Sequence, residues 1–210
     1  LGQGLHLFGH LRGESTRASW VLEFKRHIEA HRNDKAFWES VRRLSDEEKD
    51  ARLAMGVSVL LATELFGEFA PPELEAWALS AVPPPIRLWV EHYGKRAVVA
   101  DFPGTKLYLL LQRELDRYHG KPPTASRPRL VPLHGAPWVL KKQSRETWSA
   151  KRHRLAVQVR FVWFRMRFHL VEAARYKRES SRWERLLMQR EGSVRGQSGK
   201  QSPTQPVSSP

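Results

Sequence analysis

Apolar residues at helical spacing begin almost at the first residue, and this pattern most strongly limits what the chain can fold into. The segments LHLFGHL (5–11) and SWVLEFKRHI (19–28) follow each other closely, and Val21, Phe24 and Ile28 share one helical face of the second. The chain opens at Leu1, without an initiator methionine, inside this pattern. We therefore expect an upstream portion of the protein that this sequence does not contain.

The helical pattern continues to about residue 118. A capping box at residues 45–48 predicts a helix that ends at Gly67, and Pro71-Pro72 predicts the start of another helix. Further helices are expected over 86–93, closed by Gly94, and over 106–118, capped by residues 103–105. The run RAVVADF (96–102) resembles a strand, but it has no second strand to pair with. The sequence therefore predicts an all-α, irregular multi-helix domain over residues 1–118.

The second part of the chain divides into three segments. Prolines interrupt every helical window in 119–149, which predicts an irregular connection. We expect residues 150–190 to belong to a long basic amphipathic helix whose first turn begins near Trp148. The polar tail 191–210 is expected to be disordered. The apolar stripe of this helix comprises Leu155, Val159, Val162, Met166, Leu170 and Ala173, and another face carries Arg160, Arg167, Arg175, Arg178 and Arg182.

Composition narrows the class of protein. The chain has no cysteine, which excludes disulfides and thiolate metal sites and fits a cytoplasmic protein. No apolar run approaches the roughly 20 residues of a transmembrane helix. The net charge of +14 would attract nucleic acid, anionic lipid or phosphorylated ligands.

Motifs that carry chemistry are few. His6 and His10 lie one helical turn apart, but no third ligand is evident, so we expect no metal site and interpret them as hydrogen-bonding or ligand-contacting histidines. The PGTK segment (103–106) lacks the glycine spacing of a phosphate loop and is interpreted as a helix cap. No Asp-x-Asp pair and no nucleophile elbow occurs, so the sequence predicts no catalytic residue in this chain.

The arginine face of the C-terminal helix has three interpretations. Its arginines could be solvated or lie over neighbouring aromatic side chains in a helix bundle. They could instead bind the phosphates of RNA or DNA. The helix could also lie on an anionic membrane surface, with Trp163, Phe168 and Trp183 inserted.

The opening segments also resemble the C-terminal helical part of a bacterial nucleotidyltransferase-like family, in which a His-bearing helix precedes a Trp-Leu-x-Asp-Leu-like helix. His6 and His10 match the first helix, and Trp20-Val21-Leu22-Glu23 match the second, with Glu23 in place of the usual aspartate. The resemblance extends through LLATELFG (60–67) and KLYLLLQREL (106–115). It is of moderate specificity, because helical patterns are permissive.

The resemblance implies Mg²⁺-dependent transfer of a nucleotidyl group from a nucleoside triphosphate to an unknown acceptor. In that superfamily two metal ions are held by Asp-x-Asp carboxylates on an α/β domain that precedes the helices. This chain lacks that motif, so it is either a C-terminal fragment or a helical remnant without activity, and we expect it to be inactive alone. On this interpretation His10, Arg12, Trp20 and Glu23 face the cleft between the two domains and position nucleotide or acceptor. In the alternative, Trp20 is a core residue and Glu23 an exposed helix charge.

Overall fold

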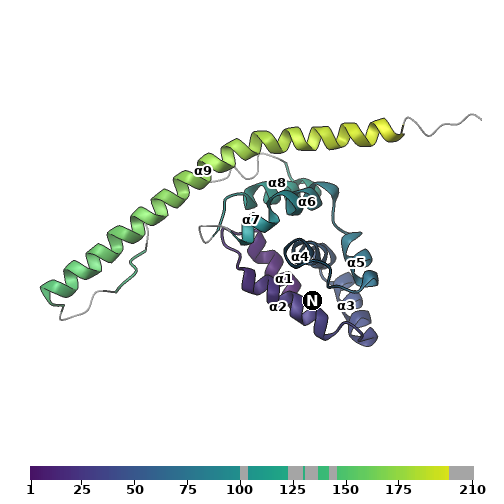
Figure 1. Cartoon of the computed structure of the whole chain (residues 1–210), viewed down its shortest axis with the longest axis horizontal. Coiled ribbons are helices and arrows are strands. Elements are labelled where there is room, and N and C mark those ends of the chain that lie inside the picture. Colours follow the sequence, from purple (N-terminus) through teal and green to yellow (C-terminus); the bar gives the residue numbers. More distant parts are fainter. Residues whose placement is uncertain (100–103, 123–129, 131–136, 142–145, 199–210) are drawn as a thin grey trace, which may run out of the picture.

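The computed structural model describes residues 1–99, 104–122, 130, 137–141 and 146–198. These residues form helices and no strand, which confirms the predicted all-α fold class (Figure 1). The helices are α1 (Gly2–Leu11), α2 (Ala18–Ala30), α3 (Lys35–Glu47), α4 (Ala51–Phe66), α5 (Pro72–Leu79), α6 (Pro84–Trp89), the π-helical turn η1 (Val90–Gly94), α7 (Lys95–Val98), α8 (Tyr108–Tyr118) and α9 (Trp148–Ser198).

Helix α4 lies at the centre of the helical body because it is apolar on nearly every face. Every residue from Leu53 to Ala62 is buried, and α4 contacts α1, α2, α3 and α5 as well as the helices that follow (Figure 1). A Cβ at Gly56 would lie 2.4 Å from the carbonyl oxygen of Ala78, so α5 can approach this closely only because residue 56 is glycine. Gly67 ends α4 with a φ of +79°, as the sequence predicts.

The predicted start of α4 is wrong. Ser45 is not an N-cap: it lies inside α3, and its hydroxyl donates to the carbonyl oxygen of Val41 at 2.7 Å. A serine hydroxyl can satisfy a carbonyl one turn back as readily as it caps a helix. The chain instead turns at Asp50, which has a φ of +65°, and α4 begins at Ala51.

Gly94 also behaves differently from the prediction. Helix α6 does not end there but continues through η1 into α7, and Gly94 keeps helical φ and ψ angles. A Cβ at Gly94 would lie 3.0 Å from Leu61, so this glycine allows close packing on α4. The strand-like segment 96–102 is helical as far as Val98, and its last three residues lie outside the described residues.

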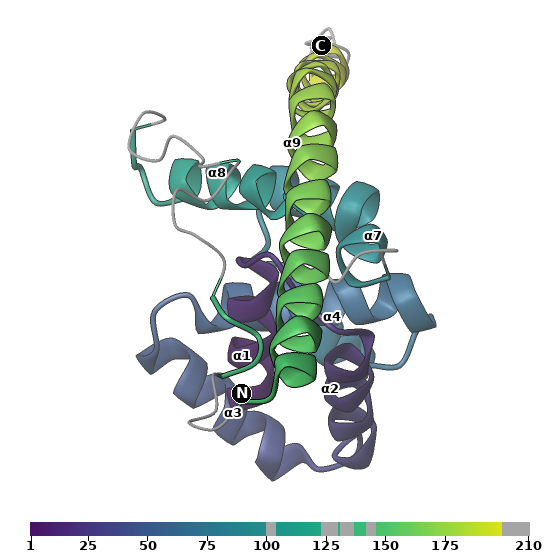
Figure 2. The ribbon, with the colours of Figure 1, turned by 90° about the vertical axis from the view of Figure 1, so that its left-hand side faces the viewer.

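Helix α9 begins at Trp148, as predicted, and continues to Ser198, into the segment for which the sequence predicts disorder. Residues 199–210 lie outside the described part of the chain. The stretch from Phe168 to Leu187 packs on the helical body, whereas the N-terminal part of α9 extends beyond it (Figure 1). In Figure 2 this part points toward the viewer, in front of the other helices.

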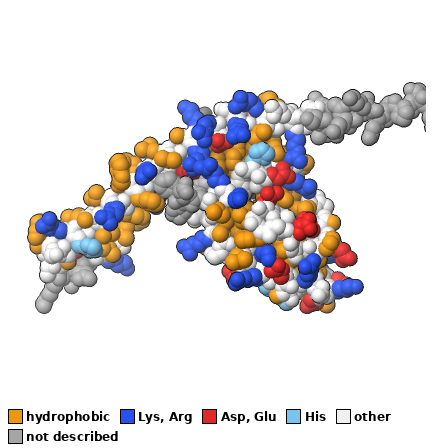
Figure 3. Space-filling model, in the orientation of Figure 1, with side chains coloured by type: hydrophobic (Ala, Val, Ile, Leu, Met, Phe, Trp, Pro, Cys, Tyr) orange, Lys and Arg blue, Asp and Glu red, His pale blue; other side chains and the backbone are white. Residues whose placement is uncertain are grey.

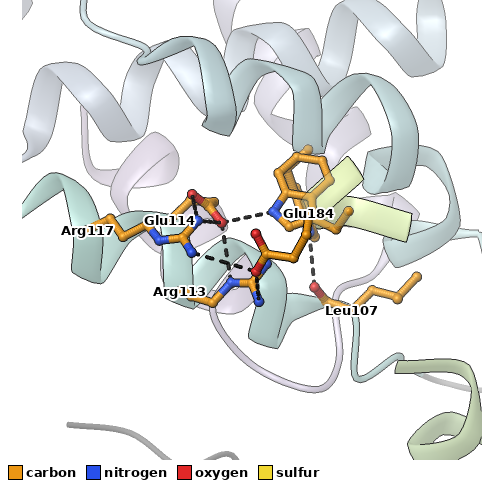
Figure 4. A network of polar contacts seen from close by, with 7 residues as sticks. Leu107, Arg113, Glu114, Arg117 and Glu184 are labelled. Carbon is orange, nitrogen blue, oxygen red and sulfur yellow. Dashed lines mark hydrogen bonds and ion pairs between the residues drawn. The ribbon is translucent and has the colours of Figure 1, made fainter. Parts of the chain in front are cut away.

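A buried polar network attaches α9 to α8 (Figure 4). The indole of Trp183 is fully buried and donates to Glu114 at 2.8 Å. Arg117 donates to both carboxylate oxygens of Glu114, and Arg113 lies 2.9 Å from Glu184. Because a buried carboxylate needs such partners, the network fixes the position of α9 along α8.

The apolar stripe predicted for α9 is real but is not the face that packs on the body. Leu155, Val159, Val162, Met166 and Leu170 are all exposed. The buried face lies elsewhere on the helix and includes polar residues, with Phe168, His169, Glu172, Glu179 and Trp183 as its members. Of the predicted irregular connection 119–149, residues 119–122, 130, 137–141 and 146–147 are described and are not helical, whereas 148–149 belong to α9.

The helices among the described residues include none that is both long and apolar enough to cross a bilayer.

Candidate functional site

The residues that carry the family resemblance meet where α1 lies beside α2. His6 and His10 lie on one face of α1, and Trp20 lies in the first turn of α2. The imidazole of His10 stacks on the indole of Trp20, with ring centroids 3.9 Å apart and planes at 29°. His6 contacts both rings edge-on, at 4.5 Å from His10 and 5.8 Å from Trp20. We call these three side chains the ring cluster.

Positive charge lies beside the ring cluster. The guanidinium of Arg17, just before α2, is 5.4 Å from the centre of the Trp20 ring. Burial lowers the pKa of His10, and the neighbouring His6 and Arg17 lower it further. The imidazole of His10 is therefore neutral at pH 7, and Arg17 supplies the fixed charge at this surface.

Glu23 and Trp20 line one small surface hollow of 220 Å³ together with Gly2, Gln3, His6 and Leu7. Glu23 lies one turn after Trp20 on α2, and its side chain is exposed. The hollow is too small for a whole nucleotide but can take a base edge or a sugar. Trp20 is half-buried against the core, so it is both a packing residue and part of this surface.

Arg12 does not join the other three predicted site residues. Its Nε donates to Oε1 of Gln112 on α8 at 3.3 Å, and its guanidinium lies 5.9 Å from the ring of Phe8. Of the four residues expected at the site, the structure therefore brings together His10, Trp20 and Glu23. Sequence reasoning missed Arg17, whose only signal is its position three residues before Trp20.

A second group of rings lies at the other end of α2. His31 stacks on Phe37 with centroids 4.1 Å apart and planes at 9°, and His27 contacts both rings. A larger hollow of 510 Å³ lies nearby, lined by Arg32, Lys35 and Arg42 among others. It contains none of the residues that carry the resemblance, but its cations make it a competing place for an anion.

The five arginines predicted to bind anions are divided by the fold. Arg160 and Arg167 are exposed on the N-terminal part of α9. Arg175 forms an ion pair with the buried Glu172. Arg178 and Arg182 lie 3.3 Å and 3.9 Å from the carboxylate of Glu179. The shared arginine face therefore becomes a set of structural ion pairs beyond residue 172.

A buried cluster joins three distant parts of the chain. Lys106 is 1% exposed, and its ammonium lies 2.7 Å from Glu14. The backbone N–H of Lys106 and the hydroxyl of Thr105 both donate to Glu172 on α9, at 3.0 Å and 2.7 Å. Burial and the ammonium of Lys106 lower the pKa of the adjacent His169. Thr105 and Lys106 of the PGTK segment therefore anchor α9.

The described residues contain no group of three or more potential ligands (His, Cys, Asp or Glu) arranged to hold a metal ion. Comparisons of the chain with known protein families, with curated proteins and with solved structures find no match.

Proposed function

We propose that this chain is the C-terminal helical region of a nucleotidyltransferase-like protein and that its α1–α2 surface contacts the nucleotide. The observation that carries the proposal concerns three residues of the motif that resembles the family: Trp20 stacks on His10 and also lines a hollow with Glu23. Their spacing in the sequence does not require the rings to stack, so the contact supports the motif as a unit.

The chemistry of this surface suits a nucleotide. Half-exposed aromatic rings offer a flat face on which a base can stack. Arg17 provides a positive charge for a phosphate, and the carboxylate of Glu23 can accept hydrogen bonds from amino or hydroxyl groups.

The transfer step itself is not assigned to this chain. Nucleotidyl transfer in the resembled family uses Mg²⁺ held by carboxylates, and the described residues do not offer such a set. The role proposed for this chain is therefore to bind and orient nucleotide.

The alternative, a nucleic-acid surface on the arginine face of α9, has less support. Three of its five arginines are engaged by Glu172 and Glu179. These carboxylates compete with an RNA or DNA backbone for the arginines, most strongly at Arg175, which is 18% exposed, whereas Arg178 and Arg182 are 75% and 64% exposed.

Calorimetric titration of the chain with each nucleoside triphosphate and Mg²⁺ tests the proposal. We expect His10→Ala and Arg17→Gln to weaken binding, by about tenfold for the loss of a stacking ring. His31→Ala is the matched control, because it removes an equally stacked histidine at the other end of α2. Equal binding by all three variants contradicts the proposed site, and label transfer from a nucleotide by the chain alone contradicts the proposed division of roles.

A further inference from the structure

The N-terminal part of α9, residues 148–171, carries a row of exposed apolar side chains. The row consists of Leu155, Val159, Val162, Met166 and Leu170, which are between 41% and 68% exposed, and Trp163 beside them is 61% exposed. Steps of three or four residues place the row along one side of the helix. Figure 3 shows hydrophobic side chains along the outer side of this part of α9.

The described polar contacts of this part of α9 lie on another side of the helix from the row. Gln158 is bonded to Val139 and to Pro137, and Arg154 is paired with Glu146. At 3.6 residues per turn, Arg154 and Gln158 lie about 100° around the helix from the centre of the row. A flat surface can therefore approach the row without displacing these contacts.

The charges beside the row indicate what kind of partner surface it fits. Residues 148–171 contain six cations, Lys151, Arg152, Arg154, Arg160, Arg165 and Arg167, and not one aspartate or glutamate. Two copies of this chain joined along the row would bring these like charges together, which disfavours a second copy as the occupant. A surface that is both apolar and negatively charged complements the row and its flanks.

We propose that this part of α9 lies in the plane of an anionic phospholipid bilayer, with the row inserted among the acyl chains and the cations at the headgroups. Nucleic acid would use the cations but would leave five aliphatic or thioether side chains in water. The proposal concerns a surface separate from the ring cluster and does not depend on nucleotide binding.

Co-sedimentation of the chain with lipid vesicles tests this proposal. We expect at least about tenfold stronger binding to vesicles that contain phosphatidylglycerol as about a third of the lipid than to phosphatidylcholine alone, and weaker binding at high salt. Val159→Gln combined with Trp163→Gln should lower binding about tenfold, because both side chains leave the apolar layer. Val99→Gln is the matched control, since Val99 is 60% exposed but lies at the end of α7.

Three results would overturn the proposal. The first is the absence of vesicle binding, or equal binding by the row variant and the Val99 variant. The second is that the chain sediments as a dimer and the Val159→Gln/Trp163→Gln variant sediments as a monomer, which would show that the row binds a second copy of the chain. The third is that the chain binds duplex DNA tightly but does not bind anionic vesicles, and that the Val159→Gln/Trp163→Gln variant binds the DNA equally well.

Discussion

The imidazole of His10 lies against the indole of Trp20, with the two ring centroids 3.9 Å apart. This contact joins the last turn of α1 to the first turn of α2. The guanidinium of Arg17 lies over the Trp20 ring of the pair. Beside this contact, burial and then the neighbouring His6 and Arg17 lower the pKa of His10.

Arg17→Gln should raise the pKa of His10 toward its ordinary value of about 6.5, because one of the nearby cations that disfavour the imidazolium is removed. Titration of the histidine ring protons by NMR measures this. The pKa of His27, lowered by burial and by His31, should stay unchanged in the same variant and serves as the internal control.

The lowered pKa values of His10, His27 and His169 also predict how stability depends on pH. In the unfolded chain these histidines have their ordinary pKa of about 6.5, and in the folded chain their pKa values are lower. At a pH between the folded and the unfolded values, the unfolded chain binds more protons. The free energy of unfolding should therefore fall as the pH falls below about 6.5. Urea unfolding at several pH values between 7.5 and 5, roughly the range of histidine titration, measures this. A stability that rises across this range as the pH falls would contradict it.

Trp183→Phe should destabilise the protein by about 1–2 kcal/mol, because the buried carboxylate of Glu114 loses its indole donor but keeps its bonds from Arg113 and Arg117. Trp148→Phe is the control, since Trp148 is 71% exposed. The comparison is made by urea unfolding. Equal stability of the two variants would mean that the bond to Glu114 does not hold α9 in place.

Glu14→Gln should cost about 3 kcal/mol, because it leaves the buried ammonium of Lys106 without its carboxylate. Lys106→Met removes both the charge and its need for a partner, and should cost less. The exposed pair Lys25–Glu29 provides the control, and Glu29→Gln should cost under about 1 kcal/mol. A reversed order of Glu14→Gln and Lys106→Met would contradict this account of the cluster.

Gly104→Ala should destabilise by about 3 kcal/mol. The residue has a φ of +126°, and an added Cβ would collide with the carbonyl oxygen of Glu14, which accepts the N–H of Thr105. Gly120→Ala isolates the backbone effect, because Gly120 also has a positive φ but has open space around it. It should cost about 1 kcal/mol. Equal costs for the two variants would show that the contact with Glu14 is unimportant.

Much of the fold could be predicted from local patterns. The buried residues of helix α4 and its end at Gly67 follow from apolar spacing and from the glycine, and the first residue of α9 follows from the end of the proline-rich segment. Predictions from local patterns were wrong at Ser45 and Gly94. The hydroxyl of Ser45 donates to a carbonyl one turn back and does not cap a helix. Gly94 does not end a helix, because it serves there to allow close packing against Leu61.

Contacts between residues far apart in the sequence could not be predicted from local patterns. Nothing near Lys106 in the sequence indicates Glu14 or Glu172 as its partners. The periodicity of α9 showed that an apolar stripe exists, but periodicity alone does not say whether the protein covers it, and α9 packs through Phe168 and Trp183 instead. At the candidate site, the resemblance singled out His10, Trp20 and Glu23, whereas the turn of Arg12 toward α8 depends on a residue 100 positions away.

Mapping of nucleotide contacts by NMR tests the central proposal most directly. In a titration of the ¹⁵N-labelled chain with ATP and Mg²⁺, we predict that the largest amide shifts fall on the end of α1 and the start of α2, around His10 and Arg17, and that they disappear in Arg17→Gln. Shifts confined to the hollow between α3 and α5 around Arg42, or no shifts at millimolar nucleotide, would contradict the account.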